Sequence, residues 1–368
     1  MNLHVVQRFE ATVTRLGVAL APDGSANEVE GVLNPASART RDGSLLLYPR
    51  VVGAGNVSRV GIARGIERGV DVGFERRGYA LEPWAAYEKR APGFGGMGCE
   101  DPRVTFIPAI DRYVMAYTAF GPDGPRIAVA LSADGLRWER LGLADFSSPG
   151  LPRGDDKDGA FFPEPVRSPG GVLSLAFYHR PMLRLSTADG HAAIPTLLDL
   201  PPENRESTRI AYVPLAPVLA DIRNLLRVTE SVLVMAPDGP WGKIKTGGGT
   251  PPIRIAEGWF SLYHGVDAVE AGGTYHMVYS AGIVVHDIEQ PHIVRYRSAS
   301  PVMRPEGADE LQGIVDNVVF PTAIDQRGER TFDVYYGMAD AKIGRARFTL
   351  APAYAAGIAE PDADENAA

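Results

Sequence analysis

Hydrophobic and polar positions alternate along many short stretches of this chain, which is the period of a half-buried β-strand. Clear examples are RIAVALS at residues 126–132 and TYHMVYS at residues 274–280. The 41 glycines and 30 prolines mostly separate these stretches, as is typical of short strands joined by turns. Helical patterns are few, and residues 219–227 are expected to form a short helix or turn. The pattern predicts an all-β protein.

A proline-marked element followed by a short aromatic-rich strand occurs five times along the chain. The strands begin near residues 43, 112, 171, 258 and 330. A unit of roughly 65–70 residues with three or four short strands is typical of a propeller blade. Five such units predict a five-bladed β-propeller, and the alternative is a β-sandwich in which the turn residues recur by coincidence. The marking prolines are Pro35, Pro102, Pro163, Pro251 and Pro321.

The composition narrows the class of protein. The chain has 368 residues, of which 45% are hydrophobic and 22% charged, as in globular proteins. We expect a single propeller domain over residues 1–350, followed by an acidic, Ala-rich tail over residues 351–368. Lys and Arg number 37 against 45 Asp and Glu, so the net charge is −8. This sign argues against nucleic acid or an anionic membrane as the main partner.

The chain carries few signs of export or metal binding. No apolar run approaches the roughly 18 residues that a membrane span needs, and the first residues do not resemble a signal peptide. We therefore expect a cytoplasmic protein. Cys99 is the one cysteine, which excludes an internal disulfide and a cysteine-based zinc site. The seven histidines lack the spacing of a helical zinc site, so we expect no metal.

The repeat itself indicates where function lies. In a propeller the innermost strands line a central channel, so residues at one end of these strands converge on one pocket. Polar side chains contributed at an equivalent position of each repeat are hard to explain as core packing. Such residues here are Asn34, Arg50, Asp101, Arg103, Glu164, His179, Arg180, His264, Asp267 and Asn317.

The stretch GCEDPR at residues 98–103 makes a resemblance specific. Together with motifs in the same order from Asn34 to Arg347, it resembles glycoside hydrolase family 130, the β-mannoside phosphorylases and related β-mannosidases. The supporting motifs are KDGAFFPEPV from Lys157, YHRP from Tyr178, GGGTPPI from Gly247, GWFSLYHGVD from Gly258, DNVVFPTA from Asp316 and VYYGMADAKIG from Val334. The family's fold is a five-bladed propeller, which agrees with the repeat count.

Asp101 is the predicted catalytic acid. Inverting glycoside cleavage by water usually needs an acid and a base about 6.5–9.5 Å apart. Phosphate is already a nucleophile, so a phosphorylase needs one acid and a cationic seat for the anion. The resemblance implies that the Asp of EDPR protonates the glycosidic oxygen through the 3-hydroxyl of the sugar. The alternative for Asp101 is a turn cap before Pro102, and Glu100 and Arg103 are expected to be orienting partners.

The predicted phosphate-binding residues are Lys157, His179 and Arg180, with Arg126 behind them. A lysine point charge beside an arginine fork suits a phosphate. Each residue alone could instead be a surface cation, above all Lys157 in the polar run GDDKDG. The hydrolases of the family are thought to lose this basic set and gain acidic residues, so its presence favours phosphorolysis.

Sugar hydroxyls are read by carboxylates, amides and arginines in a shaped pocket. The predicted sugar-binding residues are Asn34, Ser58, Arg59, His264 and Asp267. For Asp267 the alternative is an Asx turn after a strand. Glu164, Asp316 and Asp340 are further carboxylates near the motifs, and one of them facing Asp101 would favour hydrolysis.

The predicted function is an inverting glycoside phosphorylase that cleaves short β-mannosides with inorganic phosphate, giving α-D-mannose 1-phosphate and the acceptor sugar. Phosphate is a co-substrate, and no cofactor is expected. The alternatives are a β-mannoside hydrolase of the same family and a propeller that only binds glycans. The linkage and the acceptor are expected to depend on loops such as residues 71–97 and 183–215. Family members often assemble as homo-oligomers, but the sequence identifies no interface.

Overall fold

The computed structural model describes residues 9–91, 95–183 and 193–351, and the predicted tail after Ala351 lies outside the described residues. Antiparallel strands dominate this part of the chain, which confirms the all-β prediction. The expected helix or turn at residues 219–227 is present, as the end of one short helix and a 3₁₀ turn. None of the helices in the described residues is long and apolar enough to cross a membrane. The helices are α1 (Ala193–Asp199), α2 (Leu215–Ala220) and α3 (Ala308–Leu311), and the 3₁₀ turns span Ala86–Glu88, Pro108–Ile110, Pro202–Asn204 and Ile222–Leu226.

One sheet of eight strands contains the first two groups of antiparallel strands. Within the described residues, the strands of the two groups pair with each other at one short parallel contact, in which Val57 and Ser58 lie opposite Met97 and Gly98. Group 1 consists of β2 (Gly31–Arg39), β3 (Leu45–Gly53), β4 (Val57–Arg68) and β5 (Asp71–Leu81). Group 2 consists of β6 (Met97–Ile107), β7 (Arg112–Gly121), β8 (Gly124–Ser132) and β9 (Glu139–Leu143).

Two further sheets of five strands form groups 3 and 4. In each sheet, a short strand of two or three residues follows the innermost strand after a break and pairs with the same neighbouring strand. Group 3 consists of β10 (Asp156–Phe161), β11 (Val166–Arg167), β12 (Leu173–Pro181), β13 (Thr208–Pro214) and β14 (Glu230–Met235). Group 4 consists of β15 (Lys245–Gly248), β16 (Ile253–Ile255), β17 (Gly258–Ala271), β18 (Thr274–His286) and β19 (Val294–Arg297).

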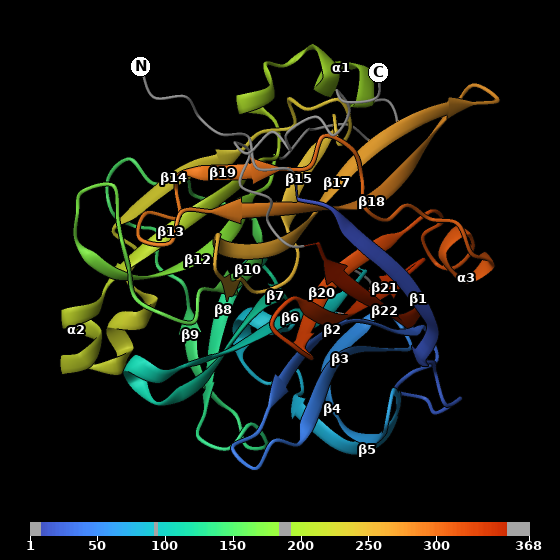
Figure 1. Cartoon of the computed structure of the whole chain (residues 1–368), viewed down its shortest axis with the longest axis horizontal. Coiled ribbons are helices and arrows are strands. Elements are labelled where there is room, and N and C mark those ends of the chain that lie inside the picture. Colours follow the sequence, from blue (N-terminus) through green and yellow to red (C-terminus); the bar gives the residue numbers. More distant parts are fainter. Residues whose placement is uncertain (1–8, 92–94, 184–192, 352–368) are drawn as a thin grey trace, which may run out of the picture.

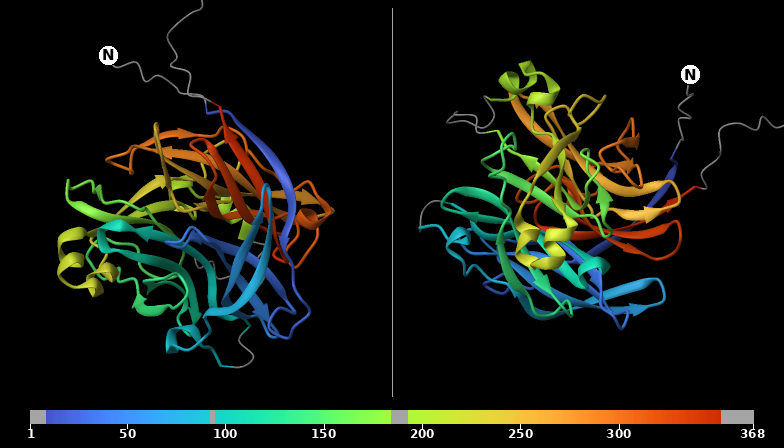
Figure 2. Two further views of the ribbon diagram at one scale, coloured as in Figure 1. Left: turned by 60° about the horizontal axis from the view of Figure 1, so that its bottom comes forward. Right: turned by 90° about the vertical axis from the view of Figure 1, so that its left-hand side faces the viewer.

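The last sheet brings the two ends of the described chain together. Group 5 consists of β20 (Val319–Gln326), β21 (Thr331–Met338), β22 (Lys342–Leu350) and the N-terminal strand β1 (Ala11–Leu20). β1 pairs antiparallel with β22, starting with Ala11 opposite Leu350, and Figure 2 shows these blue and red strands side by side. The first strand therefore completes a sheet whose other members come from the end of the chain.

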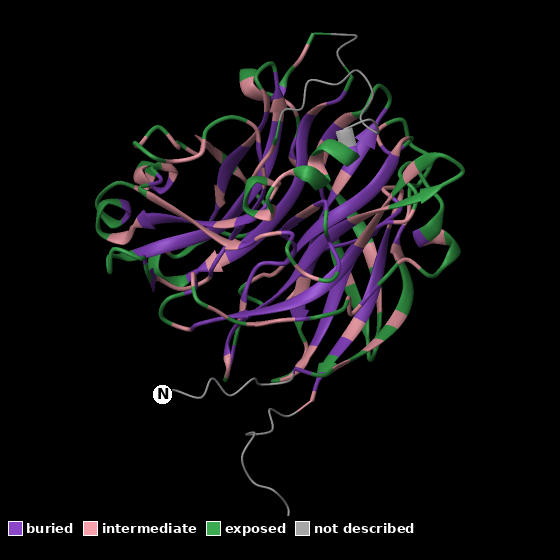
Figure 3. Cartoon of the chain, turned by 90° about the horizontal axis from the view of Figure 1, so that it is seen from above, coloured by how far each residue is buried: buried purple, intermediate pink, exposed green. Residues whose placement is uncertain are grey.

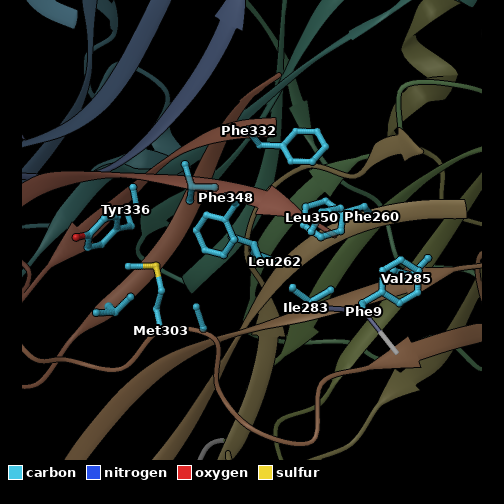
Figure 4. Packing of buried hydrophobic residues seen from close by; sticks show 14 of the residues in the cluster. Phe9, Phe260, Leu262, Ile283, Val285, Met303, Phe332, Tyr336, Phe348 and Leu350 are labelled. Carbon is cyan, nitrogen blue, oxygen red and sulfur yellow. The ribbon is translucent and has the colours of Figure 1, made fainter. Parts of the chain in front are cut away.

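Hydrophobic clusters lie between successive groups. One cluster joins groups 1 and 2 through Tyr48 and Met115, and the next joins groups 2 and 3 through Ile127 and Phe177. Figure 4 shows the cluster between groups 4 and 5, in which Phe260, Leu262, Ile283, Phe332 and Phe348 are in contact. Leu47 of group 1 shares a cluster with Tyr335 of group 5. Figure 3 shows that the buried residues follow the strands, whereas exposed residues gather in the loops.

The innermost strands of groups 1, 2 and 3 share one irregularity. In each, two consecutive residues lie opposite a single residue of the neighbouring strand, which is a β-bulge. The first bulge residue has a positive φ: 40° at Asn34, 44° at Asp101 and 64° at Asp158. Asn and Asp tolerate this left-handed conformation better than other side chains with a Cβ. The bulge turns these three side chains away from the regular alternation of the strand.

The positions of the bulges show which residues are equivalent between the groups, and for group 3 they differ from the equivalence that the prolines indicate. Pro35 and Pro102 are the second bulge residues of groups 1 and 2. The equivalent residue of group 3 is Gly159, and Pro163 lies beyond the end of β10. A residue after an Asx in this conformation needs only to fit the bulge, and both Pro and Gly do so. The proline spacing therefore located the third unit approximately but gave it the wrong register.

Candidate active site

A cavity of about 180 Å³ receives side chains from all five groups of strands. Its wall includes five of the ten predicted site residues. These five are Asn34, Asp101, Lys157, Arg180 and His264. The other lining residues are Arg50, Asp158, Met182, Lys245, Tyr279, Val315, Val318, Phe320 and Asp340.

Asp101 is almost completely buried in this cavity, with 7% of its surface exposed. Its Oδ1 atom accepts hydrogen bonds from Asn34 Nδ2 at 2.8 Å and from Arg50 Nη1 at 3.1 Å. Burial raises the pKa of the carboxyl group, but the positive charges of Arg50 and Lys157 outweigh burial and lower it below its ordinary value. Asp101 is therefore ionised at neutral pH in this environment.

Glu100 connects the cations on either side of Asp101. Its two carboxylate oxygens accept from Arg50 Nη2 at 3.0 Å and from Lys157 Nζ at 3.1 Å. Burial lowers the pKa of Lys157, but Glu100 and Asp101 outweigh it and the pKa is raised. Lys157 thus keeps its positive charge inside the protein. Arg103 is not in the cavity wall, and its Nη1 donates to the backbone oxygen of Asp101 at 2.9 Å.

Asp158 and Arg180 form a second buried pair, on the strands of group 3. Arg180 Nε donates to Asp158 Oδ2 at 2.6 Å, and its Nη1 contacts Glu206. Burial raises the pKa of Asp158, but Arg180 outweighs it, with His264 and Arg103 adding to the effect, and the pKa falls well below its ordinary value. The pair holds the guanidinium of Arg180 in the cavity wall and leaves little of the Asp158 carboxylate free.

Two buried polar atoms in the cavity wall have no hydrogen-bond partner within the described residues: Asn34 Oδ1 and His264 Nδ1. Buried polar groups in native proteins are almost always paired with protein, water or ligand. Burial, opposed by Asp158 and reinforced by Arg180, lowers the pKa of His264 to about 3, so its ring is neutral. Both atoms suit hydroxyl groups of a ligand.

Asp340 adds another carboxylate to the cavity. It lies on the hairpin turn between β21 and β22, where Ala339 and Asp340 have φ of 44° and 51°. Burial raises its pKa to about 6, with Arg50 opposing and the charge of Asp101 adding to the effect. The sequence analysis named Asp340 among the carboxylates that would favour hydrolysis, and it does line the cavity that contains Asp101.

His179 does not belong to the cavity, so its grouping with Lys157 and Arg180 is corrected. The side chain is fully buried, with Nδ1 2.8 Å from Asp156 Oδ2 and Nε2 2.8 Å from Ser231 Oγ. His179 is the single residue opposite the bulge of β10. Adjacent residues of a strand point to opposite faces, so His179 points away when Arg180 points inward. It ties the strands of group 3 together.

Arg126 also lies apart from the cavity. It lines a different pocket of about 300 Å³, together with Phe146, Arg153 and Asp156. The structure therefore does not place Arg126 behind the predicted phosphate-binding residues. Arg126 lies near the start of β8, the third strand of group 2.

Three predicted sugar-binding residues have other partners. Ser58 is buried, and its hydroxyl accepts from Arg50 Nε at 3.0 Å, so it supports the cavity from behind. Arg59 lies outside the cavity wall with its Nε 3.4 Å from Glu82 Oε1. The carboxylate of Asp267 accepts from the backbone nitrogens of Gly242 and Lys243, each at 2.9 Å. Asp267 lies inside β17 and holds a loop that precedes it in the chain, which is neither the predicted sugar contact nor the alternative Asx turn.

The sequence analysis named Arg50 as a polar strand-end residue but gave it no specific role, and it missed Asp158, Lys245 and Tyr279. Strand register accounts for Arg50 and Asp158. Arg50 and Arg180 occupy equivalent positions, because each lies opposite the residue that precedes a bulge. A signal was present, since both arginines follow a tyrosine by two residues. Asp158 is likewise equivalent to Asn34 and Asp101, but Gly follows it instead of Pro. Lys245 and Tyr279 gave no comparable signal.

Comparison with known proteins supplies the family. A family profile described as beta-1,4-mannooligosaccharide phosphorylase matches residues 5–190 and 220–352. A 1,2-beta-oligomannan phosphorylase from Thermoanaerobacter sp. (strain X514) is 31% identical over 252 residues, covering 68% of this chain and 67% of the relative. A beta-1,4-mannooligosaccharide phosphorylase from Ruminococcus albus is 37% identical over 119 residues, 32% of this chain and 34% of the relative.

Solved structures agree on the fold. The beta-1,2-mannobiose phosphorylase from Listeria innocua, in complex with beta-1,2-mannobiose, superposes with a TM-score of 0.65 at 22% identity, covering 92% of this chain and 96% of that one. Among the described residues, no group of three or more His, Cys, Asp or Glu could hold a metal ion. The family profile covers well over half of the chain, and this protein belongs to glycoside hydrolase family 130.

Proposed function

We propose that this protein is an inverting β-mannoside phosphorylase, which transfers a mannosyl group from a short β-mannoside to inorganic phosphate. The observation that carries the proposal is a buried cavity in which one acid, Asp101, faces several fixed cations. The similarity to proteins named as mannoside phosphorylases supports the same activity.

Lys157, Arg180 and Lys245 supply the seat for phosphate. All three line the cavity, and the neutral ring of His264 adds a hydrogen-bonding group beside them. Cations held in place in a low-dielectric pocket stabilise a dianion more strongly than they would in water. Because Asp158 and Glu206 hold the guanidinium of Arg180, no reorganisation is needed when phosphate binds.

Asp101 supplies the proton, and bound phosphate makes this feasible. The cations around Asp101 lower its pKa. A phosphate dianion would offset those charges, so its binding raises the pKa of Asp101 and favours uptake of a proton. The oxygen of phosphate then attacks the anomeric carbon, the bond from that carbon to the acceptor oxygen breaks, and the acceptor leaves with the proton. The family resemblance implies that this proton passes through the 3-hydroxyl of the mannose.

The mannose would satisfy the unpaired atoms of the cavity wall. Asn34 Oδ1 and His264 Nδ1 lack partners within the described residues, and sugar hydroxyls can both donate and accept. The carboxyl group of Asp340, with its pKa near 6, can hold a further pair of hydroxyls. Gly337 permits this arrangement, since a Cβ there would lie 2.0 Å from Asn34 Oδ1.

Hydrolysis is the second candidate, because Asp340 provides a carboxyl group that could activate water. Solved structures of similar fold include a β-1,2-mannoside-targeting hydrolase of the family, at a TM-score of 0.65 and 21% identity, so the fold alone does not separate the two activities. Phosphorolysis needs cations near the acid to hold the phosphate dianion, whereas a neutral water nucleophile does not. The charge of the cavity therefore favours phosphorolysis.

The overall architecture that we propose is a single five-bladed propeller over residues 1–350, acting in the cytoplasm. The five groups of strands and the clusters between them, including the one between groups 5 and 1, support it. A solved family-43 glycoside hydrolase of similar fold, at a TM-score of 0.52 and 16% identity, is consistent with this architecture. A sugar phosphate is useful only inside a cell, which favours the location.

Product analysis tests the proposal directly. The purified protein is incubated with β-1,4-mannobiose or β-1,2-mannobiose, with and without orthophosphate. We expect α-mannose 1-phosphate and mannose only when phosphate is present, because the buried cations favour phosphate over water as the nucleophile. Equal turnover in phosphate-free buffer would establish the hydrolase instead, and binding without turnover would leave only a glycan-binding protein.

Variants of the phosphate seat sharpen this test. Lys157→Ala and Arg180→Ala should raise KM for phosphate at least about tenfold, as expected for loss of one charged contact, and KM for the mannoside far less. Arg223→Ala, whose side chain is 83% exposed, serves as the control. Equal changes in both KM values would contradict the proposed seat.

A further inference from the structure

The cavity is too small to hold both sugars of a disaccharide. Its volume of about 180 Å³ is below the roughly 300–1,000 Å³ typical of sites that enclose larger ligands. If the protein is the phosphorylase proposed above, the reacting anomeric carbon and the phosphate lie beside Asp101 in this space. The acceptor sugar must then lie at the mouth, against residues that line the cavity and also reach the surface.

The segment between α3 and β20 supplies such residues. Val315 lines the cavity and has 38% of its surface exposed. Its neighbour Ile314 is 61% exposed, and Leu311 is 38% exposed. Exposed apolar residues that gather at the edge of a pocket are a feature of binding surfaces. We call residues 311–315 the rim segment.

The rim segment is held firmly against the turn that carries Asp340. The backbone nitrogens of Ile314 and Val315 donate to the carbonyl oxygen of Ala339 at 2.9 and 3.2 Å. A Cβ at Gly313 would lie 2.1 Å from the same oxygen, so only glycine permits this approach. Asn317 closes the segment by donating from its backbone nitrogen to Leu311 at 3.2 Å. A surface fixed in this way loses little entropy when a ligand binds.

We infer that Ile314 and Val315 form the apolar wall of the acceptor subsite. The ligand that fits is a carbohydrate: the C–H groups of a pyranose face pack on the two aliphatic side chains, while its hydroxyls stay in water or reach the polar cavity. This site adds to the loops at residues 71–97 and 183–215 that the sequence analysis expected to select the acceptor. Residues 184–192 of the second loop lie outside the described residues.

The reverse reaction tests the inference, because donor and acceptor are then varied separately. The unaltered protein, Ile314→Ser and Val315→Ser are supplied with α-mannose 1-phosphate and mannose, and phosphate release is measured. We expect KM for mannose to rise about three- to tenfold in each variant, as for loss of a partly exposed apolar contact, while KM for the donor changes less than twofold. The matched control is Leu219→Ser in α2, on the opposite side of the molecule in Figure 1 and 60% exposed.

Each other outcome overturns the inference in a recognisable way. Equal increases in KM for donor and acceptor would mean that the rim segment shapes the cavity rather than contacts the acceptor. Unchanged kinetics with a change in molecular mass by light scattering would make the rim segment an interface between copies of this chain. If the unaltered protein releases no phosphate here and forms no mannose 1-phosphate from either mannobiose, the proposed function fails first, and the subsite fails with it.

Discussion

Asp101 and Asp158 occupy the same position in two neighbouring groups of strands, yet their surroundings differ. Both begin a β-bulge with positive φ, and both are buried in the cavity wall. Asp101 contacts the amide of Asn34 and one nitrogen of Arg50 at 2.8 and 3.1 Å. Asp158 is bound by Arg180 at 2.6 Å and lies 3.8 Å from His264 Nε2.

The difference shows that the backbone places a carboxylate and its neighbours decide its role. Asp158 is paired with Arg180. Its negative charge therefore holds the guanidinium of the phosphate seat in place and stabilises the folded state. Asp101 is 7% exposed, against 1% for Asp158, and it faces the space for substrate, so it is available for proton transfer. The predictions below separate these two roles.

Asp101→Asn should have the largest effect. Loss of the acid is expected to lower kcat about 10²- to 10⁴-fold, because the amide has no proton to donate to the leaving oxygen. Binding of the mannoside, followed by calorimetry, should remain measurable. Turnover near that of the unaltered protein would remove Asp101 from the mechanism.

Asp158→Asn should act on stability first. Breaking one partner of a buried ion pair costs about 3–5 kcal/mol, measured here as the free energy of unfolding in urea. Folding lowers the pKa of Asp158. The ionised carboxylate therefore stabilises the folded state fully at pH values above the ordinary pKa of Asp, and this stabilisation is lost as the pH falls from there towards the lowered pKa. The variant should therefore lose its disadvantage at low pH. A kcat defect as large as that of Asp101→Asn, without loss of stability, would contradict this role.

Asp340→Asn should change the free energy of unfolding the least. It should raise the stability, whereas Asp158→Asn lowers it. Folding raises the pKa of Asp340 to about 6, so its charge opposes folding as the pH rises through about 4 to 6. Since the side chain is partly exposed, the variant should gain about 1 kcal/mol at neutral pH. The measurement is the urea unfolding curve at pH 4.5 and 7.5. Lower stability at both values would show that the charge is favourable.

The linear sequence was sufficient for the class of fold and for part of the site. Period-2 alternation and recurring turn residues identify strands because these signals are local. Asp101, Lys157 and Arg180 were predicted from short motifs, and each lines the cavity. Asn34 was predicted from its place in the repeat. The bulges show that Asn34 and Asp101 occupy equivalent positions in their groups.

The predictions from sequence failed where the role of a residue depended on the direction of its side chain or on a contact with a distant part of the chain. His179 follows Tyr178 and precedes Arg180 in one strand, so the strand pleat sends it to the other face. Asp267 ends a motif but reaches a loop 25 residues earlier in the chain. Alternation could have excluded His179 beforehand, whereas no local pattern indicates the partner of Asp267.

The amino-acid sequence by itself determined that the chain forms short strands in repeated units, since these features depend on neighbouring residues. Only the tertiary structure decided which charges share the cavity. Arg50, Asp101, Lys157 and Asp340 come from four strand groups, and the pKa of each depends on the others. Such proximity is created by folding, so it cannot be read from the order of the residues.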